Sequence, residues 1–420
     1  MSFETISVVG LGYIGLPTAA MFASRKKKVI GVDVNQHAVD TINRGEIHIV
    51  EPDLDMIVHA AVTEGYLKAV TTPEPADAFL IAVPTPFKDC AEGEIPEPDL
   101  RFIEAASKAI APVLKKGDLV ILESTSPVGA TEQMAEWLAE ARRDLTFPQV
   151  SGENADINIA HCPERVLPGH VVRELVENDR VIGGLTAKCS ERSVELYKTF
   201  VLGDCVITNA RTAEMAKLTE NSCRDVQIAF ANELSIICDK LDINVWELIS
   251  LANRHPRINI LQPGPGVGGH CIAVDPWFIV SKTPEEAQII HTARKVNDAK
   301  PEWVINKVKL AISEFLQANP DKTVKDVTVA CYGLAFKPDI DDLRESPAMA
   351  ITKELAEQHN GRVIAVEPNI GHLPKELNFD LKSFEDAINE ANVHVLLVDH
   401  SEFKQNTVDS NYIVDAKGIW

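Results

Sequence analysis

Short apolar runs alternate with helical stretches in the first half of the chain. The runs with the length and composition of strands are Ile6–Val9, Val29–Asp33, Ala78–Val83 and Leu119–Leu122. Segments of helical character lie between them, such as the small-residue stretch Leu16–Ser24. Because strands separated by helices form parallel sheets covered on both faces, we expect a doubly wound α/β domain over residues 1–208.

The pattern changes at about Thr212. From Thr212 to Asp242 the chain contains neither proline nor glycine, which predicts one long helix. About thirty residues at 1.5 Å each would span roughly 45 Å, more than one domain core usually needs, so such a helix often joins domains or forms a dimer seam. A further helix is expected over Pro301–Leu316, and together these segments predict a helical middle domain over residues 209–310.

Alternation of strands and helices resumes toward the C-terminus. The apolar runs here are Val327–Tyr332, Arg362–Val366 and Val393–Asp399. They predict a second α/β domain over residues 311–420. The expected fold is therefore two Rossmann-like doubly wound domains, joined by a helical middle domain with one long helix.

Composition narrows the choice of partners and compartment. The chain has 420 residues and a net charge of −21, which argues against binding to nucleic acid or to anionic membranes. Its start lacks a basic, apolar leader, and no apolar run approaches the roughly 18 residues of a membrane span. The 8 cysteines form no CxxC pair, so we expect no metal site, reduced thiols and a cytoplasmic protein.

A glycine-rich turn follows the first predicted strand. It reads Gly10-Leu11-Gly12-Tyr13-Ile14-Gly15 and opens a helix, and Asp33 ends the second strand. This order is the dinucleotide-binding fingerprint, in which glycines admit the pyrophosphate to a helix N-terminus. Asp33 would accept the ribose hydroxyls and repel a 2′-phosphate, so NAD is favoured over NADP.

A second glycine-rich run, Gly264-Pro265-Gly266-Val267-Gly268-Gly269-His270-Cys271, ends in a thiol. Proline and glycine exclude a regular helix or central strand here, and the bare backbone would admit another molecule. Taken alone, Cys271 could equally be an inert buried cysteine.

The long helix carries Lys217, Asn221 and Arg224 on one face. Lys217 could pair with Glu214 at the surface, but the stripe as a whole suits sugar hydroxyls and an oxyanion. Polar loops elsewhere add further cations to an acidic chain, and an anionic, diphosphate-bearing substrate would explain the set: Arg165, Lys217, Arg224, Arg257, Lys337 and Arg344.

Seven motifs together resemble the UDP-glucose/GDP-mannose dehydrogenase family. They are GLGYIGLP, VPTP, ESTSPVG, PERVLPG, AEMAKLTEN, GPGVGGHCIAVDP and FKPDIDDLRESP, in the family's order from residue 10 to 347. The resemblance implies an NAD-dependent four-electron oxidation of a UDP-sugar, with two NAD reduced. Cys271 would be the nucleophile, through a thiohemiacetal and a thioester.

The resemblance also implies roles for individual residues. Catalytic candidates are Cys271, Lys217, Asn221, Asp275, Glu164 and Thr125. Substrate contacts are expected from Arg165, Val166, Lys217, Asn221, Arg224, His255, Arg257, Gly268, Phe336 and Lys337. Cofactor contacts are expected from Gly10, Gly12, Tyr13, Ile14, Gly15, Asp33, Thr85, Thr125 and Arg344. Removal of the first proton would involve Lys217, Asn221, or a water placed by Asp275 and Thr125, and Glu164 or Asp275 would activate the hydrolytic water; the order among them stays open.

The resemblance implies UDP-N-acetylmannosamine as the sugar, and the choice of the manno epimer depends on the closeness of that resemblance alone. His270 and Val274 replace the bulkier residue and the lysine that the UDP-glucose branch usually carries, and Asn253–Arg257 matches the N-acetylhexosamine branch. UDP-N-acetylglucosamine and UDP-glucose remain alternatives. The family also implies a homodimer through the long helix and a role in bacterial surface-polysaccharide synthesis. A single-oxidation β-hydroxyacid dehydrogenase, or a non-catalytic NAD or nucleotide sensor, would leave Cys271 unexplained.

Overall fold

The computed structural model describes residues 3–49, 51–91, 93–166, 169–269, 271–373 and 377–420. Contacts divide the chain into two compact units. The first comprises Met1–Glu220 with Trp277–Lys282, and the second comprises Asn221–Pro276 with Thr283–Trp420. Each unit is described by itself.

The first unit is built on an eight-stranded sheet in the order β3-β2-β1-β4-β5-β6-β7-β8. Its strands are β1 (Thr5–Val9), β2 (Lys28–Val32), β3 (Leu67–Val70), β4 (Ala78–Ile81), β5 (Leu119–Leu122), β6 (Asn158–His161), β7 (Arg180–Gly184) and β8 (Cys205–Asn209). Neighbouring strands are parallel except for β6 and β7. The order of the first six is that of a dinucleotide-binding sheet.

Helices cover both faces of this sheet. They are α1 (Gly15–Ser24), α2 (Gln36–Asn43), α3 (Leu54–Thr63), α4 (Arg101–Ile110), α5 (Ala130–Ala141), α6 (Pro148–Ser151), α7 (Val171–Glu177) and α8 (Ala187–Tyr197). Alternate strand residues point to opposite faces. Ile6 and Val8 pack with α1, α3, α7 and α8, whereas Phe79 and Ile81 pack with α4 and α5.

Four helices follow: α9 (Ala210–Lys240), α10 (Val245–Ala252), α11 (Asp275–Lys282) and α12 (Gln288–Ala318). The long helix expected from Thr212 is α9. The helix expected to begin at Pro301 begins at Gln288, so that prediction was wrong at its N-terminal end. Proline inside a helix costs about 3 kcal/mol, but α12 buries side chains on both sides of it, including Asn297 and Val304, and this packing keeps the helix continuous.

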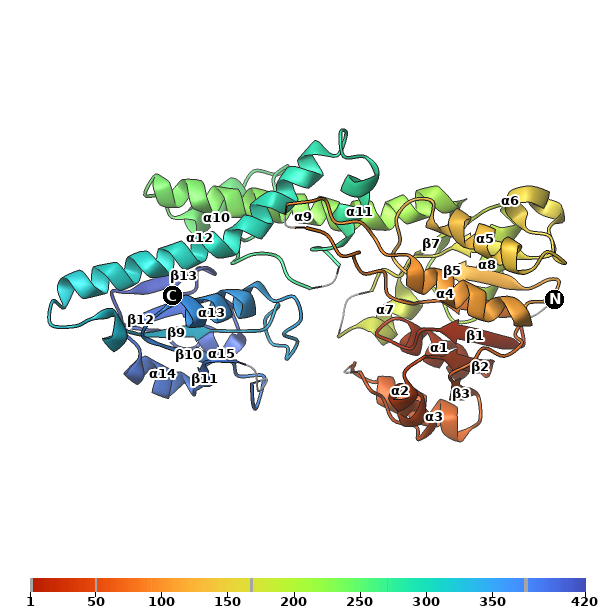
Figure 1. Cartoon of the computed structure of the whole chain (residues 1–420), viewed down its shortest axis with the longest axis horizontal. Helices are drawn as coiled ribbons and strands as arrows, with labels where there is room; N and C mark the ends of the chain where they lie inside the picture. The colour runs from red at the N-terminus through yellow and green to blue at the C-terminus, as the bar shows by residue number, and fades with distance from the viewer. Residues whose placement is uncertain (1–2, 50, 92, 167–168, 270, 374–376) are drawn as a thin grey trace. The chain divides into compact units, whose positions relative to one another are not determined.

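The second unit contains a five-stranded parallel sheet in the order β11-β10-β9-β12-β13. Its strands are β9 (Thr328–Tyr332), β10 (Arg362–Val366), β11 (Asp380–Leu381), β12 (Val393–Leu396) and β13 (Ile413–Asp415), and its helices are α13 (Pro347–Gln358), α14 (Phe384–Glu390) and α15 (Ser401–Lys404). One face packs against α12 and α13, and the other against α14 and α15 (Figure 1).

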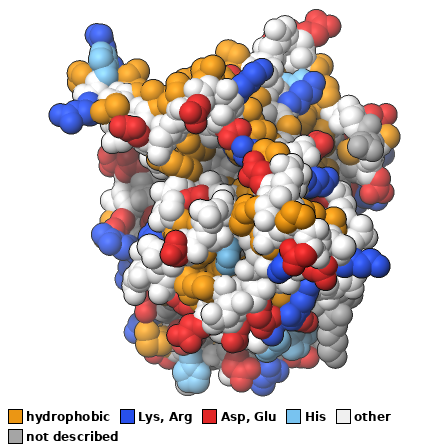
Figure 2. Space-filling model, turned by 90° about the vertical axis from the view of Figure 1, so that its left-hand side faces the viewer, with side chains coloured by type: hydrophobic (Ala, Val, Ile, Leu, Met, Phe, Trp, Pro, Cys, Tyr) orange, Lys and Arg blue, Asp and Glu red, His pale blue; other side chains and the backbone are white. Residues whose placement is uncertain are grey.

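The two parallel sheets and the long helix confirm the expected fold class. Among the described residues, no helix is long and apolar enough to cross a bilayer. On the face shown in Figure 2, acidic and basic side chains are interspersed, with hydrophobic side chains between them.

Candidate active site

The first glycine turn is shaped by close backbone approach. Gly10 has φ +90°, and a Cβ there would lie 2.7 Å from the Ala82 carbonyl oxygen. A Cβ on Gly15 would lie 1.7 Å from the Gly10 oxygen, whereas at Gly12 nothing lies within 4 Å. The fold therefore requires two of the glycines, and the third leaves open space next to the start of α1. No side chain caps that helix, so its first amides can bind a pyrophosphate.

Asp33 lies directly after β2 and beside the same turn. One carboxylate oxygen accepts the Leu11 amide at 2.8 Å, and the other accepts the Asn35 amide at 2.9 Å. The side chain is half-buried, and each carboxylate oxygen has a second lone pair that can accept a ribose hydroxyl. The residues of this turn thus fit a dinucleotide. Tyr13, 38% exposed, and Ile14, the N-cap of α1, lie in the same turn.

Two hydroxyl-bearing loops follow β4 and β5. Thr85 follows β4, and its buried Oγ1 has no hydrogen-bond partner among the described residues. Thr125 follows β5, where Ser124 Oγ donates to the Val83 carbonyl at 2.6 Å and so ties the two loops together. Both threonines therefore lie beyond the carboxyl ends of parallel strands, the edge at which such sheets bind ligands.

The bend after β6 carries Glu164, Arg165 and Val166. Glu164 is buried; Oε1 accepts the Arg165 amide at 2.7 Å, and Oε2 is paired with Arg180 at 2.9 Å. Glu51 accepts the amides of Gly169 and Val171 and so fixes the far end of the bend at α7. Glu164 is therefore a carboxylate of fixed orientation.

Behind Glu164 lies a buried cluster of ionisable groups. The Arg180 guanidinium stacks 4.7 Å from the centre of the Tyr197 ring and lies 4.0 Å from Glu123, whose Oε1 accepts the Tyr197 hydroxyl at 2.5 Å. Burial, reinforced by the charge of Glu164, raises the pKa of Glu123 to about 7, against the opposing effects of Arg180 and Tyr197. Two carboxylates thus share one guanidinium.

The helix α9 presents Lys217 and Asn221 one turn apart. The alternative pairing of Lys217 with Glu214 at the surface is wrong. Glu214 is buried, and its carboxylate accepts the amides of Gly129 and Thr131 at 2.7 and 2.8 Å at the start of α5. Burial raises the pKa of Glu214, although these hydrogen bonds lower it.

The cysteine loop is anchored to α9 near both ends, within the second unit. Asn221 Nδ2 donates to Asp275 Oδ2 at 2.5 Å, and the Gly264 amide donates to Asn232 Oδ1 at 2.9 Å. The Cys271 carbonyl accepts the amides of Val274 and Asp275 at 3.1 and 2.9 Å. Cys271 is an exposed residue, so it is not the buried cysteine of the alternative interpretation.

A buried polar chain supports the anchor at Asn232. Asn232 Nδ2 donates to Asn297 Oδ1, and Asn297 Nδ2 donates to Asp225 Oδ1, both at 2.8 Å. Arg294 pairs with Asp225 at 2.6 Å. Hydrogen bonds therefore run from an ion pair between α9 and α12 to the backbone of the loop.

The glycines of this loop admit the chain itself. A Cβ on Gly268 would lie 2.5 Å from the Glu345 carbonyl oxygen and 2.9 Å from Phe336 Cβ. Gly269 has φ +81° and faces the Phe336 ring. The space that a Cβ on Gly268 would need is therefore filled by the chain's own residues, and the contact expected between the Gly268 backbone and a substrate stays a prediction. This packing brings Gly268 and Phe336, two predicted substrate residues, together.

The remaining predicted cations differ in their partners. Arg165 pairs with Glu220 at 2.7 Å, and Arg344 with Asp342 at 2.6 Å. Within the described ranges, the other four form no ion pair: Lys217, Arg224, Arg257 and Lys337. His255 and Arg257 are exposed after α10, and neither forms a hydrogen bond or ion pair with the described part of the cysteine loop. His270 lies outside the described residues.

The glycine turn, the acid after β2 and the order of the first six strands define a dinucleotide-binding protein. Family models of the UDP-glucose/GDP-mannose dehydrogenase family match residues 4–201 (NAD binding domain), 211–299 (central domain) and 330–420 (UDP binding domain). The chain belongs to that family. The predicted family, enzyme class and cofactor, NAD, are confirmed, and the substrate class is a UDP-sugar.

Three relatives illustrate the similarity. The chain is 68% identical to UDP-N-acetyl-D-mannosamine dehydrogenase of Yersinia pestis over 100% of both chains. It is 63% identical to an NDP-N-acetyl-D-galactosaminuronic acid dehydrogenase of Ralstonia nicotianae, over 100% of this chain and 97% of the relative. The solved UDP-D-ManNAc dehydrogenase of Pyrococcus horikoshii is 36% identical with a TM-score of 0.85, covering 99% of this chain and 96% of that one.

Sequence reasoning missed the buried groups that support these residues. They are Glu51, Glu123, Arg180, Tyr197, Glu214, Asp225, Asn232, Arg294 and Asn297. One indication was available, because charged residues are almost never fully buried unless paired. The acid Glu123, directly after the apolar run Leu119–Leu122, could have been identified in this way.

Proposed function

We propose that this protein oxidises C6 of UDP-N-acetyl-D-mannosamine from a primary alcohol to a carboxylate. The reaction consumes one water and two NAD⁺ and yields two NADH and three protons with the uronate. The observation that carries the proposal is the anchored position of Cys271. It lies on a loop fixed by the hydrogen bond between Asn221 and Asp275. Lys217 lies one turn before Asn221 on α9. The two relatives at 68% and 36% identity that are named for this substrate support it.

Binding would use Arg165, which is paired with Glu220, and cations that form no ion pair within the described ranges. Phe336 and Lys337 follow the first strand of the UDP binding domain, and Lys337 is exposed. We propose that this segment contacts the nucleotide and sugar together with Val166, Gly268 and three arginines: Arg165, Arg224 and Arg257. His255 would donate to the acetamido group. The anionic diphosphate would then meet positive charge in a chain of net charge −21.

Bound NAD would supply the hydride acceptor for both oxidations. Gly10, Gly12 and Gly15 would admit its pyrophosphate, Asp33 its adenosine ribose, and Tyr13, Ile14, Thr85, Thr125 and Arg344 would contact the rest. In the first oxidation, removal of the alcohol proton would involve Lys217, Asn221, or a water placed by Asp275 and Thr125. The proton itself would go to a neutral Lys217 amine or to that water, and Asn221 would take part by hydrogen bonding, because an amide does not act as a base.

The thiol acts in the second half of the reaction. The Cys271 S–H bond breaks and its proton passes to water, while Sγ bonds to C6 of the aldehyde and the carbonyl π electrons move to oxygen. Lys217 and Asn221 would stabilise that oxyanion; Asn221 Nδ2 uses one hydrogen for Asp275 and retains the other. Loss of hydride from C6 then leaves a thioester, the acyl form that water can cleave.

Hydrolysis needs a base to take a proton from water. Glu164 and Asp275 are the two candidates, and both are buried carboxylates of fixed orientation. Water adds to the thioester carbon, the C–S bond breaks, and the thiol is restored. Glu164 already accepts an amide and pairs with Arg180, so one of its oxygens can still accept from water.

We also propose how the chain is organised and where it acts. The three family matches support domains at 1–208, 209–310 and 311–420. Phe230, Ile237 and Leu241 are 52%, 42% and 61% exposed at helical spacing along and just after α9, which supports a homodimer through this helix. A reducing, cytoplasmic location fits eight cysteines of which none is in a disulfide.

The experiment compares catalytic efficiency on four nucleotide sugars with NAD. The panel contains UDP-N-acetylmannosamine, UDP-N-acetylglucosamine, UDP-N-acetylgalactosamine and UDP-glucose, because a 63% identical relative is named for a galactosaminuronic acid. UDP-N-acetylmannosamine should be the best substrate. UDP-glucose as the best would refute the N-acetyl assignment, and another N-acetyl sugar would refute the epimer alone.

A cysteine comparison tests the nucleophile. Cys271→Ala should abolish uronate formation while NAD and UDP-sugar still bind. Cys90→Ala, at an exposed cysteine outside the proposed site, should leave the rate unchanged. Steady uronate production by Cys271→Ala would exclude the covalent mechanism.

A further inference from the structure

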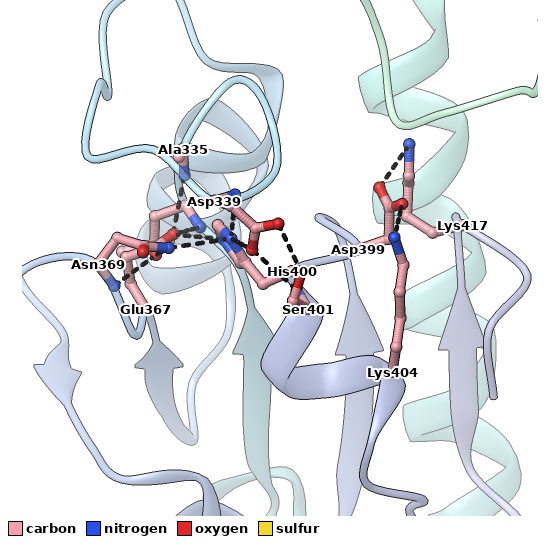
Figure 3. Close-up of polar contacts among 10 residues, drawn as sticks. Ala335, Asp339, Glu367, Asn369, Asp399, His400, Ser401, Lys404 and Lys417 are labelled. Carbon is pink, nitrogen blue, oxygen red and sulfur yellow. Dashed lines mark hydrogen bonds and ion pairs between the residues drawn. The ribbon is translucent and has the colours of Figure 1, made fainter. Parts of the chain in front are cut away.

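The loop that carries Phe336 and Lys337 is fixed at both ends by buried side chains of its own domain. At its start, the amides of Leu334 and Ala335 donate to Glu367 Oε2 at 2.7 and 3.0 Å. At its end, the Asp339 amide donates to His400 Nδ1 at 2.9 Å. His400 Nε2 lies 3.0 Å from the same oxygen of Glu367, so one pair of side chains joins both ends of the loop (Figure 3).

The start of this loop repeats the first dinucleotide turn. Gly10 and Gly333 each donate their amides to the last residue of the neighbouring strand at 2.8 Å. Leu11 donates to Asp33, as Leu334 donates to Glu367. The C-terminal α/β domain therefore contains the same kind of turn, with an acid at the equivalent position after its second strand.

The two acids differ in burial and in the partners of their oxygens. Asp33 is half-buried and accepts one amide on each oxygen. Glu367 is 3% exposed; Oε2 meets two amides and His400, and Oε1 accepts the amide and the side chain of Asn369 at 3.1 Å. Both carboxylate oxygens of Glu367 are thus occupied by groups of its own domain, and the carboxylate holds the start of the loop instead of accepting a ribose hydroxyl.

The hydrogen bonds determine the tautomer of His400. A backbone amide can only donate, so Nδ1 must carry a lone pair toward the Asp339 amide. Asn369 Nδ2 also lies 3.1 Å from Nδ1. The ring proton is therefore on Nε2, and Nε2–H donates to Glu367. His400 is fully buried, so water cannot replace these bonds.

The far end of the loop is tied to α15 by a second contact. Asp339 accepts the Ser401 amide at 2.8 Å and the Ser401 hydroxyl at 2.7 Å (Figure 3). Asp339 itself adopts φ +61°, a conformation that non-glycine residues rarely adopt. The loop therefore ends in a strained residue whose main chain and side chain both bond to the segment at His400.

We propose that His400 and Glu367 are positioning residues for UDP-sugar binding. They set the conformation of the Phe336–Lys337 segment and thereby the affinity for the uridine diphosphate, without touching it. This inference rests on the proposed function. A purely structural role for the pair would lower thermal stability and leave the affinity of the folded protein for the nucleotide unchanged.

The experiment measures the dissociation constant of UDP by calorimetry, with the KM of the UDP-sugar, the KM of NAD and kcat, on the full-length protein. His400→Ala removes the bonds to Asp339 and Glu367. Lost hydrogen bonds of this kind should weaken UDP binding about threefold to tenfold. The KM of the UDP-sugar should rise by the same factor, with kcat and the KM of NAD unchanged.

Two further variants separate positioning from stability. His400→Asn places an oxygen near the position of Nδ1 and should recover part of the UDP affinity. The control is His394→Ala, at a buried histidine of the same domain whose Nδ1 lies 2.9 Å from the Tyr332 hydroxyl and whose ring forms no hydrogen bond with residues 334–339, all of which are described. It should lower the melting temperature without changing the UDP affinity.

Unchanged UDP affinity in folded His400→Ala would overturn the inference, as would an equal loss of affinity in His394→Ala. If His400→Ala does not fold, Asp339→Ala replaces it, since that side chain is 53% exposed and its loss should still weaken UDP binding. If the unmodified protein neither binds UDP nor reduces NAD with any UDP-sugar, the proposed function fails. If it does both and the variants match it, the positioning role alone fails.

Discussion

Replacing Glu123 by glutamine should stabilise the protein at alkaline pH and leave it nearly unchanged at acidic pH. Glu123 is 1% exposed, directly after β5, and shares Arg180 with Glu164. Burial in this position raises the pKa of Glu123 from 4.5 to about 7. Glutamine keeps the shape and the acceptor for the Tyr197 hydroxyl but cannot ionise.

The sign and size follow from proton linkage. A carboxyl whose pKa is raised on folding contributes stability that is fully present below its unfolded pKa, near 4.5, and is lost as the pH rises through about 7. A shift of this size corresponds to roughly 3 kcal/mol at most. For a unit of this size that is a change in melting temperature of about 6–12 °C.

The assay is thermal unfolding of the unmodified protein and of Glu123→Gln between pH 5 and pH 8.5. The difference in melting temperature should be small at pH 5 and should widen in favour of the variant as the pH rises. Glu136→Gln, at an exposed position of α5, is the matched control and should change stability by less than about 0.5 kcal/mol at every pH. A difference that does not depend on pH would refute the reasoning, because Glu123 would then be ionised and paired with Arg180 throughout.

Three further substitutions test other parts of the account. Asp33→Ser should relax the preference for NAD, because it removes a like-charge contact with a 2′-phosphate worth at least about 1 kcal/mol; equal use of NADP by the unmodified protein would contradict the assignment. Asn232→Ala removes the acceptor for the Gly264 amide and should lower kcat about tenfold, with both KM values unchanged. The control Glu233→Ala, at the exposed neighbouring residue, should have no effect. An unchanged kcat in Asn232→Ala would show that the anchor does not position Cys271. Arg180→Met leaves two buried carboxylates without their cation and should lower the free energy of unfolding by about 3–5 kcal/mol. Arg173→Met, in an exposed ion pair, should lower it by about 0–1 kcal/mol. Equal losses in the two variants, measured by denaturant unfolding, would contradict the role given to burial.

The parts of the fold that depend on neighbouring residues could be predicted from the sequence. The dinucleotide turn is one continuous stretch whose glycines and following strand lie within about twenty residues. The long helix α9 was predicted because nothing in it interrupts helical geometry. Pro301 led to the wrong start of α12. Proline disfavours a helix interior locally, but the side chains buried on both sides of Pro301 outweigh that preference.

Contacts between distant residues could not be predicted in this way. Glu367 and His400 are 33 residues apart and meet only because β10 and β12 flank β9. Gly264 belongs to the glycine-rich cysteine motif, but its partner Asn232 lies 32 residues away and belongs to none of the seven motifs. The sequence also suggested that the glycines around Cys271 admit a ligand, whereas the absent Cβ of Gly268 is required by the Glu345 backbone. The number of glycines indicated that something approaches the backbone closely, but it did not identify which residues or molecules do so.

The central claim is that one site performs two oxidations through Cys271. The measurement that tests it most directly is the number of NADH formed per UDP-sugar consumed at completion, with the product identified as the uronate by mass. The account predicts two NADH for each uronate, with no aldehyde released. One NADH per sugar consumed, with an aldehyde as the product, would contradict it and would favour the single-oxidation dehydrogenase.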